Sequence, residues 1–383
     1  MMLFWRRPSF LLLLYSALAV GASLHAYLRG KKSETSPYTH YNNFLIFRQS
    51  YFHLRDGKDL YQEYPTEHWD YYKYSPTFAL LMFPFAFLPD WLGLILWNLT
   101  NALLVWTAIY ALPLGEGIQA KVLLFCAIEL LTSIQNSQSN GLMAGLMVWA
   151  FALFERKRFI WGALMIALSF HIKLFSLILL SLLLFYPERW RAGFYTLFWI
   201  GSLALLPLIH IGPTELLSLY RSWIHLLSWD YEGSVGLSVA GWLRNWFGLT
   251  PPKPLITLVG LTLLLLPLVR KELYQMQEFR LLFLSSLLIW SVIFNHKAES
   301  PTYIIAVVGI ALWYFLKERS LSDKLLAGFV FVFTSLSPTD IFPPIFRQKL
   351  VIPFALKAFP CIIGWVRIGW EMIRKQRTQV EGI

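Results

Sequence analysis

Long apolar segments alternate with short polar ones along nearly the whole chain. About 20 consecutive apolar residues can cross the hydrocarbon core of a bilayer as a helix. The pattern therefore predicts membrane helices connected by polar turns. The predicted helices cover residues 10–28, 91–112, 118–134, 139–154, 192–210, 254–270, 281–295, 302–316, 325–336 and 350–370, and a further apolar run at 159–186 is interrupted by His171 and Lys173.

The longest polar stretch, residues 41–76, follows the first apolar run and precedes all the others. Within it, large apolar residues recur at spacings of three to four, which predicts an amphipathic surface helix over 41–55 with Arg48 on its polar side. These residues are Phe44, Phe47, Tyr51 and Leu54. The next segment, 75–88, is apolar but short and broken by prolines, so we expect it to dip into the membrane without crossing.

Composition supports the membrane class. Of the 383 residues, 57% are hydrophobic and only 14% are charged, whereas an average soluble domain carries about 25% charged residues. The first apolar run resembles a signal peptide, but it has only a weak cleavage pattern, so we interpret it as an uncleaved helix and keep cleavage as the alternative. Cys126 and Cys361 both lie in apolar runs, which favours neither a disulfide framework nor a metal site.

The net charge of +11 comes from short basic clusters between the apolar runs rather than from one basic surface. Such clusters are typical of cytoplasmic turns in membrane proteins. They include Arg6–Arg7, Arg156–Arg158, Arg189 with Arg191, Arg270–Lys271, Lys317 with Arg319 and Lys324, and Arg374–Lys375.

Placing every basic cluster in the cytoplasm fixes a topology. It requires 159–170 and 174–186 to be two short helices that enter the membrane and return. The expected fold is an all-α polytopic membrane protein of about 12 transmembrane helices, forming one domain over residues 1–383 with both termini in the cytoplasm. The outward face then carries a loop and amphipathic helix at 29–74, a second loop at 211–252, and several shorter polar junctions.

Three of these outward junctions carry candidate binding residues. Gln138 and Asn140 lie in an amide-rich run at the head of a helix, where they either bind an anion or simply cap the helix. His171 and Lys173 interrupt an apolar run, where ionisable residues are costly and point to function, with snorkelling of the lysine as the alternative. His296 and Lys297 offer phosphate contacts or form an ordinary charged loop.

The stretch 41–76 supplies the candidate carboxylates. Glu67 and Asp70 precede the run YYKYSP, which contains Lys73 and Tyr74. A carboxylate can remove the proton from an acceptor hydroxyl during sugar transfer, and aromatic rings can stack on sugars. For any single carboxylate here, a solvated loop charge is the simpler explanation. The others are Asp56, Asp59, Glu63 and, just upstream, Glu34, and the histidines His40, His53 and His68 lie in or beside the stretch.

At these residues the chain resembles the polytopic glycosyltransferases of the GT-C fold, most closely glycosyltransferase family 87. The matching segments, in order, are GKDLY (57–61) with YKYSPTFALLMFPFAFLP (72–89), SQSNGLMAGLMVWAFAL (137–153), RFIWGALMIALSFHIKLFSLILLSLLLFYPERWR (158–191) and NHKAESPTYIIAVVGIALW (295–313). The order and spacing of these segments carry the resemblance, since each motif is weak alone.

The resemblance implies a sugar donor linked to a polyprenyl phosphate, commonly with mannose, and transfer with inversion on the outer face of the cytoplasmic membrane. It implies donor-phosphate contacts at His171 and Lys173, to which the charge argument adds His296 and Lys297. Gln138 and Asn140 would position the substrate, together with Asn42, Asn43, Arg48, Lys73 and Tyr74. No cofactor and no metal are expected.

One departure from the family pattern concerns the base. Family members carry an aspartate shortly after the first helix, and its counterpart here is Asn43, with Asn42 beside it. Because an amide cannot act as a base, either the base is Asp70 or, second, Glu67, or the acceptor differs, or the protein has lost transferase activity. The acceptor would be a glycolipid or cell-envelope glycan, and nucleic acid is not an expected partner. Two alternatives stay open: a flippase or transporter of lipid-linked sugars, and an inactive GT-C-like assembly subunit.

Overall fold

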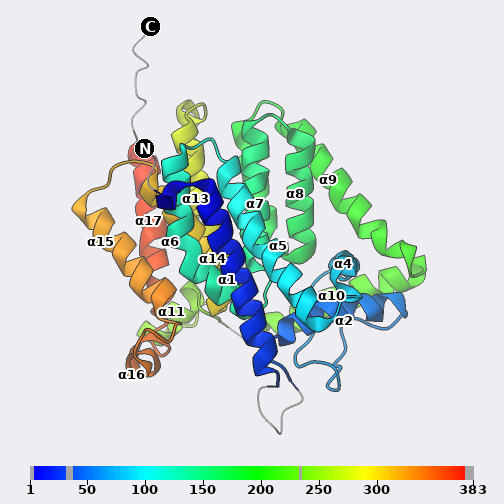
Figure 1. Ribbon diagram of the computed structural model, residues 1–383. Helices are drawn as coiled ribbons and strands as arrows, with labels where there is room; N and C mark the ends of the chain where they lie inside the picture. Colours follow the sequence, from blue (N-terminus) through cyan, green and yellow to red (C-terminus); the bar gives the residue numbers. More distant parts are fainter. Residues whose placement is uncertain (1–3, 32–37, 233–234, 376–383) are drawn as a thin grey trace. The chain divides into compact units, whose positions relative to one another are not determined.

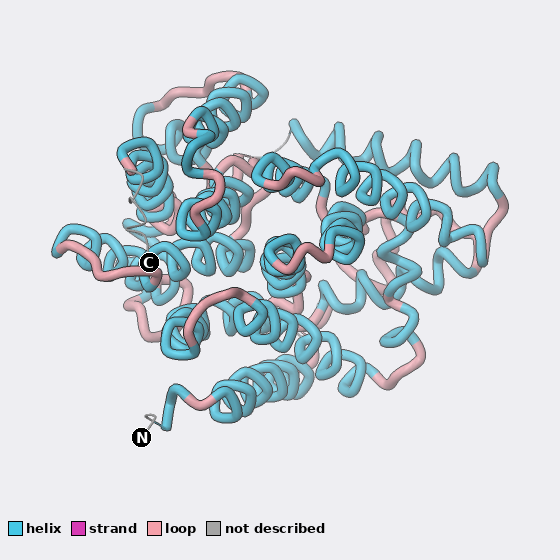
Figure 2. Tube along the Cα trace, turned by 90° about the horizontal axis from the view of Figure 1, so that it is seen from above, coloured by secondary structure: helices cyan, strands magenta, loops and turns pink. Residues whose placement is uncertain are grey.

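The computed structural model describes residues 4–31, 38–232 and 235–375, so Glu34 and the remainder of 32–37 lie outside the described residues. In the described part of the chain all regular elements are helices, and the one β-bridge joins Lys31 to Thr39 (Figure 2). The all-helical class expected from the sequence is therefore confirmed. The chain divides into two compact units, residues 1–177 with 190–234 and residues 178–189 with 235–383.

The first unit contains most of the N-terminal helices (Figure 1). In chain order they are η1 (Phe4–Arg6), α1 (Pro8–Arg29), α2 (Asn42–Arg55), α3 (Pro76–Leu81), α4 (Phe83–Ala86), α5 (Asp90–Ala111), α6 (Glu116–Gln135), α7 (Asn140–Glu155), α8 (Phe159–Ile172), α9 (Arg189–Leu205), η3 (Leu206–Ile209) and α10 (Pro213–Glu232).

The second unit begins within the 3₁₀ segment η2 (Leu174–Phe185) and resumes after α10. Its remaining elements are α11 (Val239–Phe247), α12 (Lys253–Leu265), η4 (Leu266–Val269), η5 (Lys271–Leu273), α13 (Gln277–Ile293), η6 (Ser300–Thr302), α14 (Tyr303–Phe315), α15 (Leu321–Val330), η7 (Phe331–Leu336), α16 (Pro344–Phe346), η8 (Arg347–Val351) and α17 (Phe359–Arg374).

Among the described residues, four helices are long and apolar enough to cross a membrane: α1, α5, α6 and the continuous segment Arg189–Ile209. In α1, one stripe of side chains that includes Leu11, Tyr15 and Ala19 is buried, while Leu13 and Leu28 are exposed. An apolar helix with an exposed apolar face needs lipid around it. The chain is thus a membrane protein, and the total of about 12 transmembrane helices stays a prediction.

Helices α1, α5, α7 and α8 pack as neighbours in the first unit (Figure 1). The approach of α7 to α5 is close because α7 carries glycines four residues apart, Gly141 and Gly145. A Cβ on Gly145 would lie 2.7 Å from Leu104 Cγ, and one on Gly141 would lie 3.1 Å from the Asn101 carbonyl oxygen. Small residues at this spacing let membrane helices pack backbone to backbone.

The interrupted apolar run breaks where the sequence predicted. Helix α8 ends at Ile172, Lys173 is extended with φ −145°, and η2 follows. The amphipathic helix 41–55 is also present, as α2, and its apolar side chains, Phe44 and Leu54 among them, are buried in the protein.

The segment 211–252, expected to be a loop, contains the two helices α10 and α11. Helix α10 is amphipathic: its buried side chains include Leu216, Leu219, Trp223 and Leu226, at helical spacing. The helix was not predicted because the range 211–252 was taken as one loop between membrane helices, and the three-to-four spacing that identified 41–55 was not sought there. A helix that packs against protein on one face needs only one apolar stripe.

Candidate active site

The polar turn before α7 is held by α5. The Trp97 indole Nε1 donates to the carbonyl of Ser137 at 2.9 Å, and the Asn101 Oδ1 accepts from the backbone N–H of Leu142 at 2.8 Å. Ser137 has φ +52°, in the left-handed region. These contacts fix the buried Asn140 at the first turn of α7.

Lys173 reaches this turn. Its Nζ donates to Asn140 Oδ1 at 2.6 Å, and the Asn140 Nδ2 donates to Gln138 Oε1 at 2.6 Å. The two predicted binding segments, 33 residues apart at these positions, therefore meet through a chain of hydrogen bonds. The Lys173 ammonium thus donates to an amide oxygen of the turn before α7.

His171 is buried and makes hydrogen bonds of its own. Its Nε2 donates to the carbonyl of Ile200 at 3.1 Å, and its Nδ1 is buried without a hydrogen-bond partner. The His171 carbonyl accepts from the Ser75 hydroxyl at 2.7 Å and from the Ser75 backbone N–H at 3.3 Å. Ser75, absent from the sequence prediction, thus ties the polar stretch to the end of α8.

The first turn of α2 binds two other segments. Asn42 makes two hydrogen bonds with the backbone of Trp69, donating at 2.7 Å and accepting at 2.9 Å. Asn43 donates to the carbonyl of Asn136 at 2.9 Å, in the turn before α7. The side chains of Asn42 and Asn43 therefore hold the segment around Trp69 and the turn before α7 against the start of α2.

Arg48 and Tyr74 connect α2 to the segments that follow it. Arg48 forms an ion pair with Asp90 at the start of α5 and donates to the carbonyl of Ala86 at 2.9 Å. These contacts brace α2 against α4 and α5. The ring of Tyr74 packs against Phe47 with centroids 5.0 Å apart.

Asp70 stands in an unusual backbone conformation with φ +79°. Its carboxylate accepts from the Tyr71 backbone N–H at 2.8 Å and pairs with Lys73 Nζ at 3.1 Å. Lys73 also lies 3.6 Å from the carboxylate of Asp230, on α10. Asp230 was not predicted from the sequence, because α10 was not predicted. The amphipathic pattern of α10 is the signal that would have revealed the helix and Asp230 on it.

Glu67 pairs with a buried histidine of α2. Its carboxylate lies 2.9 Å from His53 Nε2, and the His53 ring stacks on Tyr64 with centroids 3.8 Å apart. Burial lowers the pKa of His53 below its ordinary value of 6.5, although Glu67 opposes the shift. The imidazole is therefore neutral at pH 7, and its Nε2–H donates to the carboxylate.

His296 and Lys297 belong to the second unit. They form part of the turn between α13 and η6, where the backbone N–H of Lys297 donates to the Asn295 side chain at 2.9 Å. Both side chains are partly exposed. Within the second unit, Leu237 donates its N–H to the carbonyl of Ala298 at 2.8 Å and so anchors this turn.

In the first unit, then, Gln138, Asn140 and Lys173 form one chain of hydrogen bonds. Asn42, Asn43 and His171 bind neighbouring segments through other contacts, and Asp70, Lys73 and Asp230 form a second group. Over the described residues, no cluster of three or more histidine, cysteine, aspartate or glutamate side chains is placed to hold a metal ion. The roles predicted for all these residues remain predictions.

A protein-family model matches the chain. The family model of glycosyltransferase family 87 matches residues 72–295, which is more than half of the chain. The matched range includes Lys73, Asn140 and Lys173, and it begins after Asp70. No curated protein matches the chain.

Proposed function

Because the chain belongs to glycosyltransferase family 87 and is a membrane glycosyltransferase, we propose that it transfers a hexose such as mannose from a polyprenyl-phosphate donor. The acceptor is a glycolipid or a cell-envelope glycan, and the reaction inverts the anomeric centre. The protein lies in the cytoplasmic membrane with both termini inside and the site facing outwards. No cofactor and no metal take part.

The single observation that carries the proposal is the contact from Lys173 through Asn140 to Gln138. A lysine at the break of an apolar run is costly unless it serves a function. The sugar leaves behind a lipid phosphate, so the leaving group gains negative charge in the transition state. Lys173 compensates that charge, as a fixed cation does most effectively in a site of low dielectric constant.

The base is a carboxylate of the polar stretch, with Asp70 preferred and Glu67 second. The base takes the proton of the acceptor hydroxyl. At the same time the hydroxyl oxygen attacks the anomeric carbon on the side opposite the phosphate. The bond between that carbon and the phosphate oxygen breaks, and its electron pair stays on the phosphate. His171 is a further phosphate-binding candidate in the first unit, and Asn42 and Asn43 position the acceptor side. For His296 and Lys297, in the second unit, phosphate binding stays a prediction from the sequence.

A transfer assay in membranes tests these assignments. With radiolabelled polyprenyl-phosphate hexoses as donors, Lys173→Gln should lose most of the transfer to the acceptor. Asp70→Asn should lower the rate by about 10²–10⁴-fold, the usual contribution of a general base, and Glu67→Gln should act more weakly. Asp56→Asn is the matched control, because Asp56 is an exposed carboxylate of the same stretch that pairs with Arg55.

Three outcomes contradict parts of the proposal. Full activity of both Asp70→Asn and Glu67→Gln refutes the base assignment. Donor movement across the membrane without a glycosidic product indicates a flippase. Donor binding without turnover in the wild type, with co-purification of an active partner, indicates an inactive subunit.

A further inference from the structure

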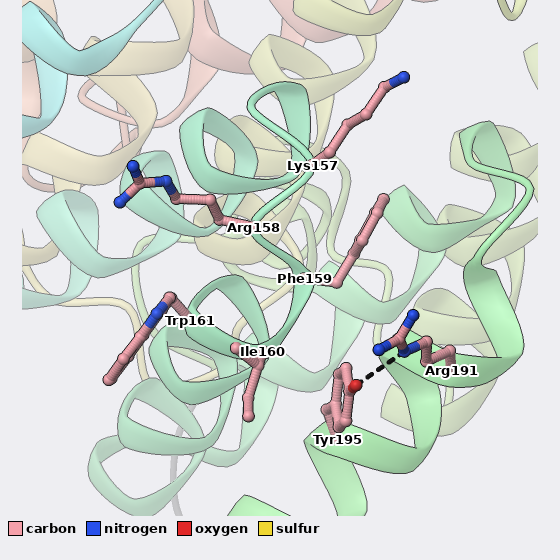
Figure 3. Close-up of a pocket in the computed structure, with 7 residues that line it drawn as sticks. All are labelled: Lys157, Arg158, Phe159, Ile160, Trp161, Arg191 and Tyr195. Atoms are coloured by element: carbon pink, nitrogen blue, oxygen red, sulfur yellow. Dashed lines mark hydrogen bonds between the residues drawn. The ribbon is translucent and has the colours of Figure 1, made fainter.

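A pocket of about 310 Å³ lies at the other end of α8 from Lys173. The residues that line it come from the turn between α7 and α8, from the first turn of α8 and from the start of α9 (Figure 3). They are Lys157, Arg158, Phe159, Ile160, Trp161, Arg191 and Tyr195. Ligand pockets begin at about this volume, and the proposed transfer reaction uses none of these residues.

The pocket is cationic. In the described parts of the chain none of Lys157, Arg158 and Arg191 forms an ion pair with a carboxylate, and all three are exposed. Arg191 is oriented by its own helix, since its Nε donates to the Tyr195 hydroxyl at 2.7 Å (Figure 3). Lys157 has φ +58°, in the left-handed region that is costly for a residue with a Cβ. This conformation forms part of the turn between α7 and α8.

An extended apolar surface leads away from the cations. Helix α9 belongs to one of the four segments able to cross a membrane, and its exposed side chains include Phe194, Leu197 and Phe198, with Leu197 72% exposed. Ile160 and Trp161, which line the pocket, are exposed as well. A ligand that matches both surfaces has an anionic head and long apolar chains.

We propose that this pocket binds the phosphate headgroup of an anionic phospholipid, with the acyl chains lying along the exposed face of α9. Lys157 and Arg191 contact the phosphate, and Trp161 and Tyr195 lie at the level of the headgroups, where such aromatic residues are enriched. Basic pockets between membrane helices bind anionic headgroups in this way. A free phosphate would make no use of the apolar face.

Lipid retention by the full-length protein tests the proposal. The protein is reconstituted in nanodiscs of equal parts phosphatidylcholine and phosphatidylglycerol, released into mild detergent, and weighed with its bound lipids by native mass spectrometry. The wild type should retain phosphatidylglycerol in preference to phosphatidylcholine. A double variant, Lys157→Gln with Arg191→Gln, should lower that retention by more than about tenfold, and each single variant by several-fold.

The matched control is Lys324→Gln, which removes an exposed cation at the start of α15 and should leave retention unchanged. Unchanged retention in the two single variants, whose elution on size exclusion reports folding, overturns the proposal. An equal loss in Lys324→Gln also overturns it, because the effect would then follow net charge. Displacement of the lipid by excess inorganic phosphate identifies a small-anion site and rejects the lipid assignment.

Discussion

Asp70 combines a candidate chemical role with a strained backbone. A residue other than glycine in the left-handed region costs about 1–2 kcal/mol, and the hydrogen bond from the Tyr71 N–H to the Asp70 carboxylate offsets part of that cost. The side chain therefore has two possible reasons to be there: to shape the turn, or to accept a proton. Substitutions that keep one property and remove the other separate them.

We expect Asp70→Gly to fold with the stability of the wild type and to lose transfer activity. Asp70→Ala should lose activity too and also lower the free energy of unfolding by about 1 kcal/mol relative to the glycine variant. Thermal unfolding in detergent and the transfer assay give the two readings. An active Asp70→Gly variant would mean that the carboxylate only shapes the turn.

The buried histidines beside the carboxylates predict a dependence of stability on pH. Burial lowers the pKa of both His53 and His68 below the ordinary value of 6.5. Below pH 6.5 the unfolded chain therefore binds more protons than the folded chain, so stability should fall as the pH falls through this range. Unfolding temperatures between pH 7.5 and about 5 measure the slope.

The double variant His53→Gln with His68→Gln should flatten that slope. His225→Gln, on the exposed side of α10, is the control and should keep it. A slope that survives in the double variant would assign the pH dependence to other groups.

At the scale of elements, the hydrophobic pattern predicted helices well where they are apolar all round. It located α1, α5, α6, α7 and the break after α8 to within a few residues. It missed the amphipathic helix α10, which lies in a range taken as a loop, although the same spacing of apolar residues identified α2. It also could not reveal which helices touch, since the contacts of Asn101, Trp97 and Ser75 depend on packing rather than on local sequence.

The contact between α5 and α7 makes a direct prediction. Gly145→Val should lower stability by about 1–3 kcal/mol, the usual cost of overpacking, because even a Cβ would lie 2.9 Å from the Leu104 carbonyl carbon. Gly21→Val on α1 is the control, since nothing lies within 4 Å of a Cβ there. Equal stability of the two variants would show that this close approach is not required.

For the whole molecule, the sequence predicted the membrane class and the family, and both are confirmed. The network around Lys173 joins segments that the sequence had only set side by side as candidates. The choice of base between Asp70 and Glu67 stays a prediction, since the family match begins at residue 72, after both carboxylates. The number of crossings and their direction remain predictions, since they depend on the membrane as well as on the chain.

Cysteine labelling tests which side of the membrane each polar segment faces. Both native cysteines are buried, so single introduced thiols report their own side. In intact cells, Gln62→Cys in the polar stretch should react with a membrane-impermeant maleimide, while Lys324→Cys should react only after lysis. The reverse pattern would invert the proposed topology.

The bonds from Ser75 to the His171 carbonyl have a consequence for biogenesis. Where α8 ends, its last carbonyls lose their partners inside the helix, and Ser75 and His171 are both buried away from water. Ser75 supplies two donors to one of these carbonyls. Ser75 precedes His171 by 96 residues and is therefore synthesised first. The donor of these two hydrogen bonds is thus already present when α8 is inserted into the membrane, and the bonds can form as soon as α8 folds.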